Sequence, residues 1–112
     1  MPMKDTLLHY IDERIAWHRG EQSCLKAEYR QDEAIHMQIA VNVYSIFRST
    51  YCALQFDHDE TVRRFSGIVN SWEESRKLAC AHRDEEKRQI EEIKIAHAME
   101  ILRIAKEMEA AL

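Results

Sequence analysis

Residues 34–56, AIHMQIAVNVYSIFRSTYCALQF, decide the fold class, because their apolar side chains recur with the period of an α-helix. The apolar line contains Ile39, Val43, Ile46 and Leu54, widened by Ile35, Ala40, Phe47 and Tyr51. The opposite face contains Gln38, Asn42, Ser45, Arg48 and Ser49. Such a division into two faces is typical of an amphipathic helix. We expect this helix to run from about Cys24 to Phe56.

Helical patterns also lie on both sides of this segment. A first helix is expected from about Met3 to Arg19, and Gly20 fits the position that ends a helix. A polar cluster at residues 57–60 marks the next boundary, since Asp57 and Glu60 have the spacing of a capping box. A third helix follows this cluster. A fourth occupies residues 90–112, after a stretch in which the apolar face is lost.

These patterns predict an all-α fold, an antiparallel helical bundle of four helices forming one domain over residues 1–112. The turns are expected near residues 20–23, 57–59 and 80–84. Glycine and proline together number three, too few for the turns that strands and hairpins need. The predicted core is Leu8, Ile11, Ile15, Leu25, Ile39, Val43, Ile46, Phe47, Phe65, Val69, Trp72, Ile93, Ile101, Ile104 and Met108.

Three alternatives to these boundaries remain open. A continuous helix from Glu60 to the C-terminus would give three helices, one of them very long. The last helix could instead start at Ser71, because residues 71–74 also have the pattern of a capping box. The first helix could pass through Gly20 and continue to about Arg30, since the apolar line is not interrupted there.

Composition and charge exclude several classes of function. The formal net charge is −4, so the surplus of Lys and Arg that a nucleic-acid-binding protein uses is absent. No stretch approaches the roughly 18 apolar residues of a membrane span, and no secretion signal opens the chain. Cys24, Cys52 and Cys80 are an odd number and form no C-x-x-C pair. We expect reduced thiols in a cytoplasmic protein, with no nucleic-acid or membrane partner.

Histidine placement gives the strongest candidate site for chemistry. Glu33 and His36 have the Glu-x-x-His spacing by which a bundle helix offers two ligands to one metal. His18 and His97 also fall on apolar faces and could complete a site for zinc, iron or manganese. A second copy of the motif fails, because Lys94 stands three residues before His97. We therefore favour buried or interface histidines and no cofactor, with metal binding as the alternative.

Surplus apolar faces point to association with another chain. The last helix carries apolar residues over an arc of about 200°, wider than the ~100° that one core requires. Tyr10 and Trp17 lie on a second face of the first helix. The predicted interface residues are Tyr10, Trp17, Ile95, Ala98, Leu102 and Ala105. No Gly-rich loop or nucleophile motif is present. We expect a non-enzymatic interaction or scaffold module that forms a homodimer or higher homo-oligomer and could also bind another protein.

Overall fold

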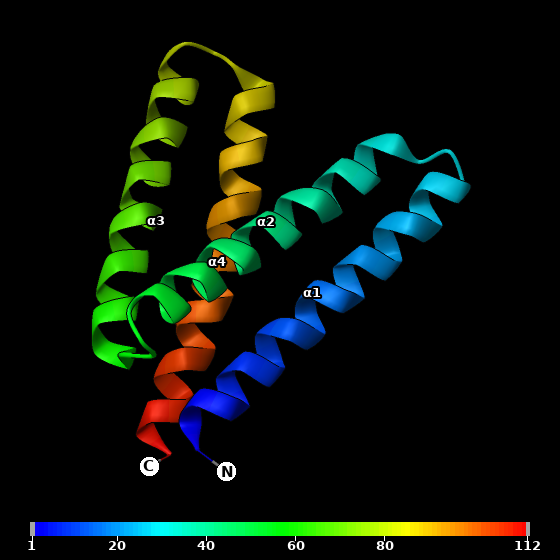
Figure 1. The fold of residues 1–112 in the computed structure, drawn as a ribbon. Coiled ribbons are helices and arrows are strands. Elements are labelled where there is room, and N and C mark those ends of the chain that lie inside the picture. The colour runs from blue at the N-terminus through cyan, green and yellow to red at the C-terminus, as the bar shows by residue number, and fades with distance from the viewer. Residues whose placement is uncertain (1, 112) are drawn as a thin grey trace.

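The computed structural model describes residues 2–111, and within them the chain forms four α-helices and no β-strand (Figure 1). The helices are α1 (Met3–Ala27), α2 (Gln31–Ala53), α3 (His58–Ala81) and α4 (Glu85–Ala110). This confirms the predicted all-α class with four helices. The alternative of one continuous helix from Glu60 onward is wrong, because the chain turns at residues 82–84.

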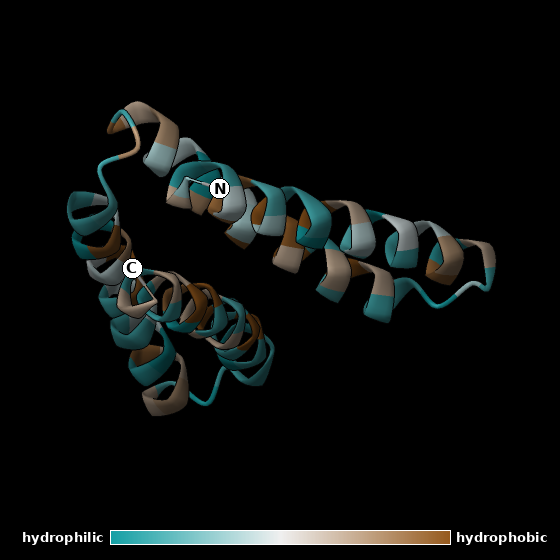
Figure 2. Cartoon of the chain, turned by 90° about the horizontal axis from the view of Figure 1, so that it is seen from below, coloured by the Kyte–Doolittle hydropathy of each residue, from teal (hydrophilic) through white to brown (hydrophobic). Residues whose placement is uncertain are grey.

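The four helices pair as two hairpins, α1 with α2 and α3 with α4 (Figure 1). Contacts are most extensive within each hairpin, and α2 against α4 is the main contact between them. Seen from below, the hairpins diverge from this contact (Figure 2). The radius of gyration is 15.1 Å, against about 13 Å for a compact chain of this length. No helix among residues 2–111 is apolar over enough of its length to cross a membrane.

The end of α1 corrects the preferred boundary at Gly20. α1 continues through Gly20 to Ala27, and a side chain built at Gly20 would meet nothing within 4 Å. The turn falls at residues 28–30, as the alternative of a longer first helix predicted. A glycine inside a helix costs about 1 kcal/mol relative to alanine. Burial of Ile15 and Leu25 on either side of Gly20 outweighs that cost.

α1, α2 and α3 end in a motif that usually contains glycine, but none of the three uses a glycine there. At the end of α1, the Arg30 N–H donates to the Leu25 carbonyl and the Tyr29 N–H to that of Lys26, which defines a Schellman motif. Tyr29 takes the left-handed conformation that closes the motif, with φ 61°. The same bond pattern closes α2 and α3, with Gln55 and Arg83 in the equivalent left-handed position. The sequence therefore lacks the usual signal for these turns.

Aspartates start the second hairpin's helices. The Asp57 carboxylate accepts a hydrogen bond from the Glu60 N–H at 3.1 Å, and Asp84 accepts from the Lys87 N–H at 3.1 Å. These side chains satisfy backbone donors that the first turn of a helix leaves free. The predicted boundaries near 57–59 and 80–84 are confirmed. Ser71 starts no helix, since it lies inside α3 and donates to the Gly67 carbonyl.

The core lies where α2 crosses α4 and packs between α1 and α3. Of the predicted core, the buried members are Ile11, Ile15, Leu25, Val43, Phe47, Phe65, Val69 and Ile101. Those only half-buried are Leu8, Ile39, Trp72, Ile93, Ile104 and Met108. Ile46 is exposed, which makes its assignment wrong. The buried face of α2 is centred on Val43, Tyr44, Phe47 and Tyr51, so it is rotated away from the predicted apolar line.

Candidate functional site

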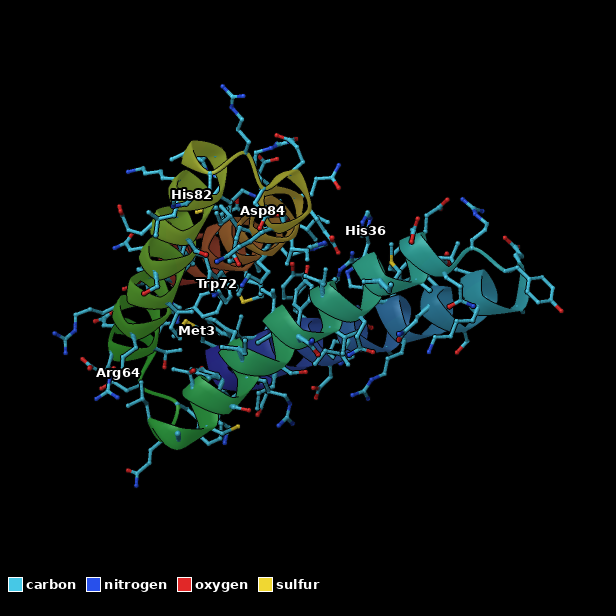
Figure 3. All side chains as sticks on the ribbon, turned by 90° about the horizontal axis from the view of Figure 1, so that it is seen from above. Met3, His36, Arg64, Trp72, His82 and Asp84 are labelled. Carbon is cyan, nitrogen blue, oxygen red and sulfur yellow. The ribbon has the colours of Figure 1, made fainter. Side chains whose placement is uncertain are left out.

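The predicted metal ligands do not assemble into one site. Glu33 is exposed and pairs with Arg30, and His36 lies one turn further along α2 at the space between the hairpins (Figure 3). No group of three or more His, Cys, Asp or Glu among residues 2–111 could hold a metal ion. The Glu-x-x-His spacing is therefore that of two surface residues. No ligand set for zinc, iron or manganese forms around it.

His18 and His97, by contrast, meet directly. Their rings are 5.2 Å apart between centroids and nearly perpendicular, at 85°. Tyr44 of α2 packs against both, at 5.5 Å from His18 and 5.9 Å from His97. The α1–α2 and α3–α4 hairpins cross obliquely (Figure 1), and this brings His18 of α1 and His97 of α4 together.

Burial keeps this cluster neutral, and Arg14 adds to the effect. Its guanidinium lies 3.4 Å from His18 Nε2 and 5.0 Å from the centre of the Trp17 ring. Burial is the main cause that lowers the pKa of His18 to about 4, and the nearby Arg14 and His97 lower it further. Burial, followed by Arg14, also lowers the pKa of His97. Both imidazoles are therefore neutral at pH 7. Burial, reinforced by Tyr44, raises the pKa of Tyr10 beyond its usual range, so its hydroxyl remains protonated.

The predicted interface residues occupy different environments. Ala98 and Ala105 are fully buried in the chain's own core and Leu102 is only 5% exposed, so their assignment to an interface is corrected. The reason is that α4 contacts both α3 and α2, which together cover its wide apolar arc. The remaining three retain accessible surface: Tyr10 and Ile95 are half-buried, and Trp17 is 49% exposed.

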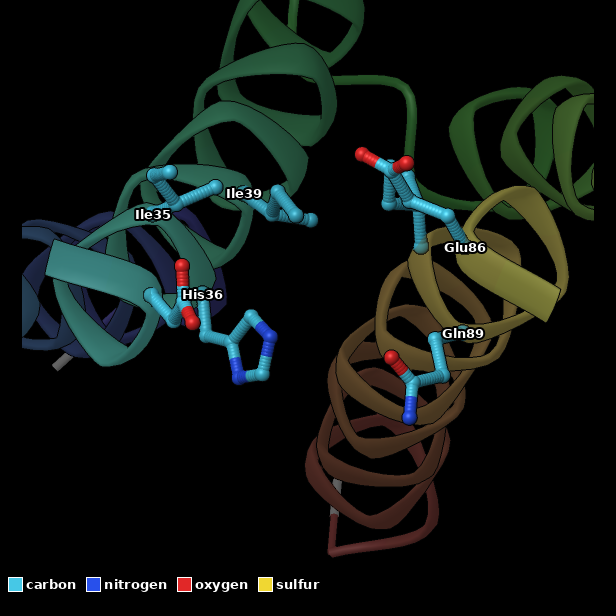
Figure 4. A pocket seen from close by; sticks show the side chains of 7 residues that line it. Ile35, His36, Ile39, Glu86 and Gln89 are labelled. Atoms are coloured by element: carbon cyan, nitrogen blue, oxygen red, sulfur yellow. The ribbon is translucent and has the colours of Figure 1, made fainter.

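A cleft separates the N-terminal halves of α2 and α4. It has a volume of about 330 Å³ and is lined by Asp32, Ile35, His36, Ile39, Glu86, Gln89 and Ile90. Figure 4 shows the α2 side chains facing those of α4 across the opening. Ile35 is 54% exposed here, although it belongs to a helix whose other face is fully buried. Apolar side chains thus face each other across the cleft without forming a closed core.

The cleft continues into an unpartnered apolar face of α2, which we name the α2 stripe. It consists of Ile35, Ile39, Asn42, Ile46, Ser49 and Ala53. Successive members are separated by four, three, four, three and four residues, the spacing of helices that pack as a coiled coil. A second hollow, of about 540 Å³, lies on this face around Asn42 and Ile46. On the α1 side, Gln38 donates to Asn42 at 2.9 Å and accepts from Gln22 at 3.0 Å.

Two features of these sites were missed by sequence reasoning. The 4-3-4 spacing of the α2 stripe is readable in the sequence, but Ile39 and Ile46 were assigned to the core and Asn42 to a polar face. The second missed feature is Arg14, which the sequence also distinguishes from other arginines. No acidic residue lies three or four positions away from it, whereas Arg30, Arg88 and Arg103 all pair with acids at that spacing.

The structure thus defines a two-hairpin all-α protein with an open apolar face and a neutral histidine pair. Comparison with protein-family models, with curated proteins and with solved structures finds no match to this chain.

Proposed function

We propose that this protein is a non-enzymatic helical interaction module that acts as a homodimer, and that the α2 stripe is its contact surface. The observation that carries the proposal is the spacing of exposed isoleucines on α2. Ile35 and Ile46 are 54% and 37% exposed, and Ile39 is half-buried between them. An exposed apolar line of this kind is typical of a surface that another helix covers.

The spacing favours a second copy of the chain as the partner. In a parallel pair in register, each residue of the stripe faces the same residue of the other copy, so Ile39 meets Ile39, Ile46 meets Ile46 and the two Asn42 side chains meet between them. The two copies are then related by a two-fold axis parallel to the paired helices. A buried asparagine pair also fixes the register of such helices at some cost in stability.

The surface area of the chain agrees with a missing partner. Its accessible surface is 6987 Å², whereas a monomer of 13.3 kDa exposes roughly 6,500 Å². The excess is of the same order as the ~800 Å² that each partner buries in a standard interface.

The three free cysteines lie on three different helices, which supports a reducing compartment such as the cytoplasm.

Light scattering coupled to gel filtration tests the proposal. We expect a mass of twice 13.3 kDa for the unmodified chain at micromolar concentration. Ile35→Glu combined with Ile46→Glu should return a monomer, because it places two charges in the contact. Leu78→Glu is the matched control, since Leu78 is 57% exposed on α3 and outside the stripe.

A second variant acts in the opposite direction. Asn42→Leu should tighten association about tenfold or more, because it replaces the polar pair at the centre by an apolar one. A monomeric unmodified chain, or dissociation by Leu78→Glu alone, would reject the α2 stripe as the contact.

A further inference from the structure

Arg14 differs from the other arginines of the described chain. Each of the others either pairs with a carboxylate or is exposed, whereas Arg14 is half-buried and has no acidic group within ion-pair distance among residues 2–111. Its neighbours are the neutral His18 imidazole and the Trp17 ring. A partly buried guanidinium without a counter-charge leaves strong hydrogen-bond donors available to a ligand.

A hollow opens beside this guanidinium, between α1 and α4. Its volume is about 460 Å³, and it is lined by Tyr10, Arg14, Tyr44, Ala96, His97 and Glu100. Its walls are aromatic, since the Tyr10 and Tyr44 rings are 6.4 Å apart and the Tyr44 and His97 rings 5.9 Å apart. Ala96 is small and leaves room at the α4 side. The hollow therefore combines flat apolar walls with a single cation.

Glu100 is the other charged group that lines the hollow, and its carboxylate pairs with Arg103 rather than with Arg14. Arg103, followed by Arg14, lowers the pKa of Glu100. The two histidines are neutral at pH 7. The Tyr10 hydroxyl is protonated and can donate a hydrogen bond. Of the groups that line the hollow, Arg14 is the cation without an ion pair among the described residues, Glu100 is paired with Arg103, and Tyr10 carries a neutral hydroxyl.

We propose that this hollow binds a carboxylate attached to a flat apolar group, such as an aromatic ring. The Arg14 guanidinium would hold the two carboxylate oxygens as a fork, and the rings of Tyr10, Tyr44 and His97 would flank the apolar group. One guanidinium matches one negative charge. A phosphate dianion beside Glu100 would lack a second cation, so a carboxylate fits better.

Such a carboxylate has two sources, a free aromatic acid or the C-terminal residue of a peptide. Benzoate is the probe for the first, and acetyl-Gly-Phe with a free C-terminus is the probe for the second. Benzamide and the Phe-amide peptide are the matched neutral forms. Binding of benzoate alone identifies a small acid as ligand, and binding of the peptide alone identifies a chain terminus.

Titration of the full chain, followed by the NMR signals of the histidine rings, tests the site. We expect at least one of the acids to bind with a Kd of about 1 mM, as is usual for ligands of this size, and neither neutral form to bind. Arg14→Gln should weaken binding at least tenfold. Arg19→Gln is the control, because Arg19 is exposed on the same helix and lacks a carboxylate partner.

Occupation of the site should also raise the pKa of His97, since a bound carboxylate offsets the charge of Arg14. This measurement uses the unmodified protein and does not depend on the folding of a variant. The proposal is overturned if acids and amides shift the histidine signals equally, if Arg14→Gln binds as the unmodified chain does, or if no probe gives a saturable shift. None of these results bears on the α2 stripe, which lies on another face.

Discussion

The ring of His18 meets that of His97 edge to face, 5.2 Å between centroids, and so joins the first helix to the last. His18 is 2% exposed, and its Nδ1 has no hydrogen-bond partner in the protein. A charge on the His18 ring would lie beside the Arg14 guanidinium and among the rings of His97, Tyr44 and Trp17. The contact between α1 and α4 therefore requires neutral histidines.

Acid should weaken the fold through His18. Its pKa is about 4 in the folded chain, against the ordinary 6.5 of a histidine, which is the value expected once the chain unfolds. The unfolded state therefore binds a proton first as the pH falls. Stability should be constant above about pH 6.5 and decrease below it. The loss from His18 alone is roughly 2.5 kcal/mol at about pH 4.5. Urea unfolding at several pH values measures this decrease.

The matching variants separate His18 from the carboxylates that also titrate in acid. His18→Leu should remove the part of the decrease between about pH 6.5 and pH 4.5 that His18 contributes, and should leave the part that comes from His97, whose pKa is also lowered in the folded chain. His82→Gln changes an exposed histidine in the α3–α4 turn and should leave the decrease in place. An unchanged pH profile in His18→Leu would show that the buried pair does not control acid stability.

The ion pair between Glu91 and Lys94 should matter more than those on the surface. Glu91 is 6% exposed, lies 2.8 Å from Lys94 Nζ, and has a second oxygen without a partner. Lys94 also lies 4.9 Å from the centre of the Trp72 ring on α3. Lys94→Met should cost about 3 kcal/mol, because it leaves a carboxylate buried without its counter-charge. Chemical unfolding of the variant measures the loss.

A surface pair of the same spacing provides the control. Glu74 and Lys77 are exposed and 3.4 Å apart, so Lys77→Met should change stability by less than about 0.5 kcal/mol. Combining Lys94→Met with Glu91→Leu should recover most of the stability, since no charge is then buried. Equal losses for Lys94→Met and Lys77→Met would contradict the burial of Glu91.

Gly20 should be a site of stabilisation by alanine. It lies inside α1 with nothing within 4 Å of an added Cβ. Gly20→Ala should raise the free energy of unfolding by about 0.5–1 kcal/mol. The reverse change Ala16→Gly, at an exposed position one turn earlier, should lower it by a similar amount. A loss of stability in Gly20→Ala would mean that α1 is broken there.

The boundaries that the sequence predicts correctly are those that carry a cap. Asp57 and Asp84 accept hydrogen bonds at the first turns of α3 and α4, and aspartate is a favoured residue at that position. The end of α1 carries no such signal, because Tyr29 occupies the left-handed position where glycine is common. The nearest glycine, Gly20, is helical and misled the assignment. Local residue preferences thus fix a helix end only where the preferred residue is used.

The candidate sites were less predictable, because they depend on the angle between the hairpins. Periodicity placed His18 and His97 on apolar faces but did not bring them together. Ile46 was counted with the core, since an apolar residue at helical spacing is the same in sequence whether it faces its own chain or solvent. The buried side of α2 follows from how it crosses α4, which is a long-range property. For that reason Ile46, which was predicted to be in the core, is exposed, and Ala98, which was predicted to be at an interface, is buried.

The short connections within each hairpin also determine how the chain folds. Three residues join α1 to α2 and three join α3 to α4, so the helices that contact each other most are neighbours in the sequence. Closing such short loops loses little chain entropy. Topologies of this kind fold within microseconds to milliseconds. Most contacts within each hairpin are therefore local, and the packing of α2 on α4, across the linker that holds Gln55 and Phe56, completes the core.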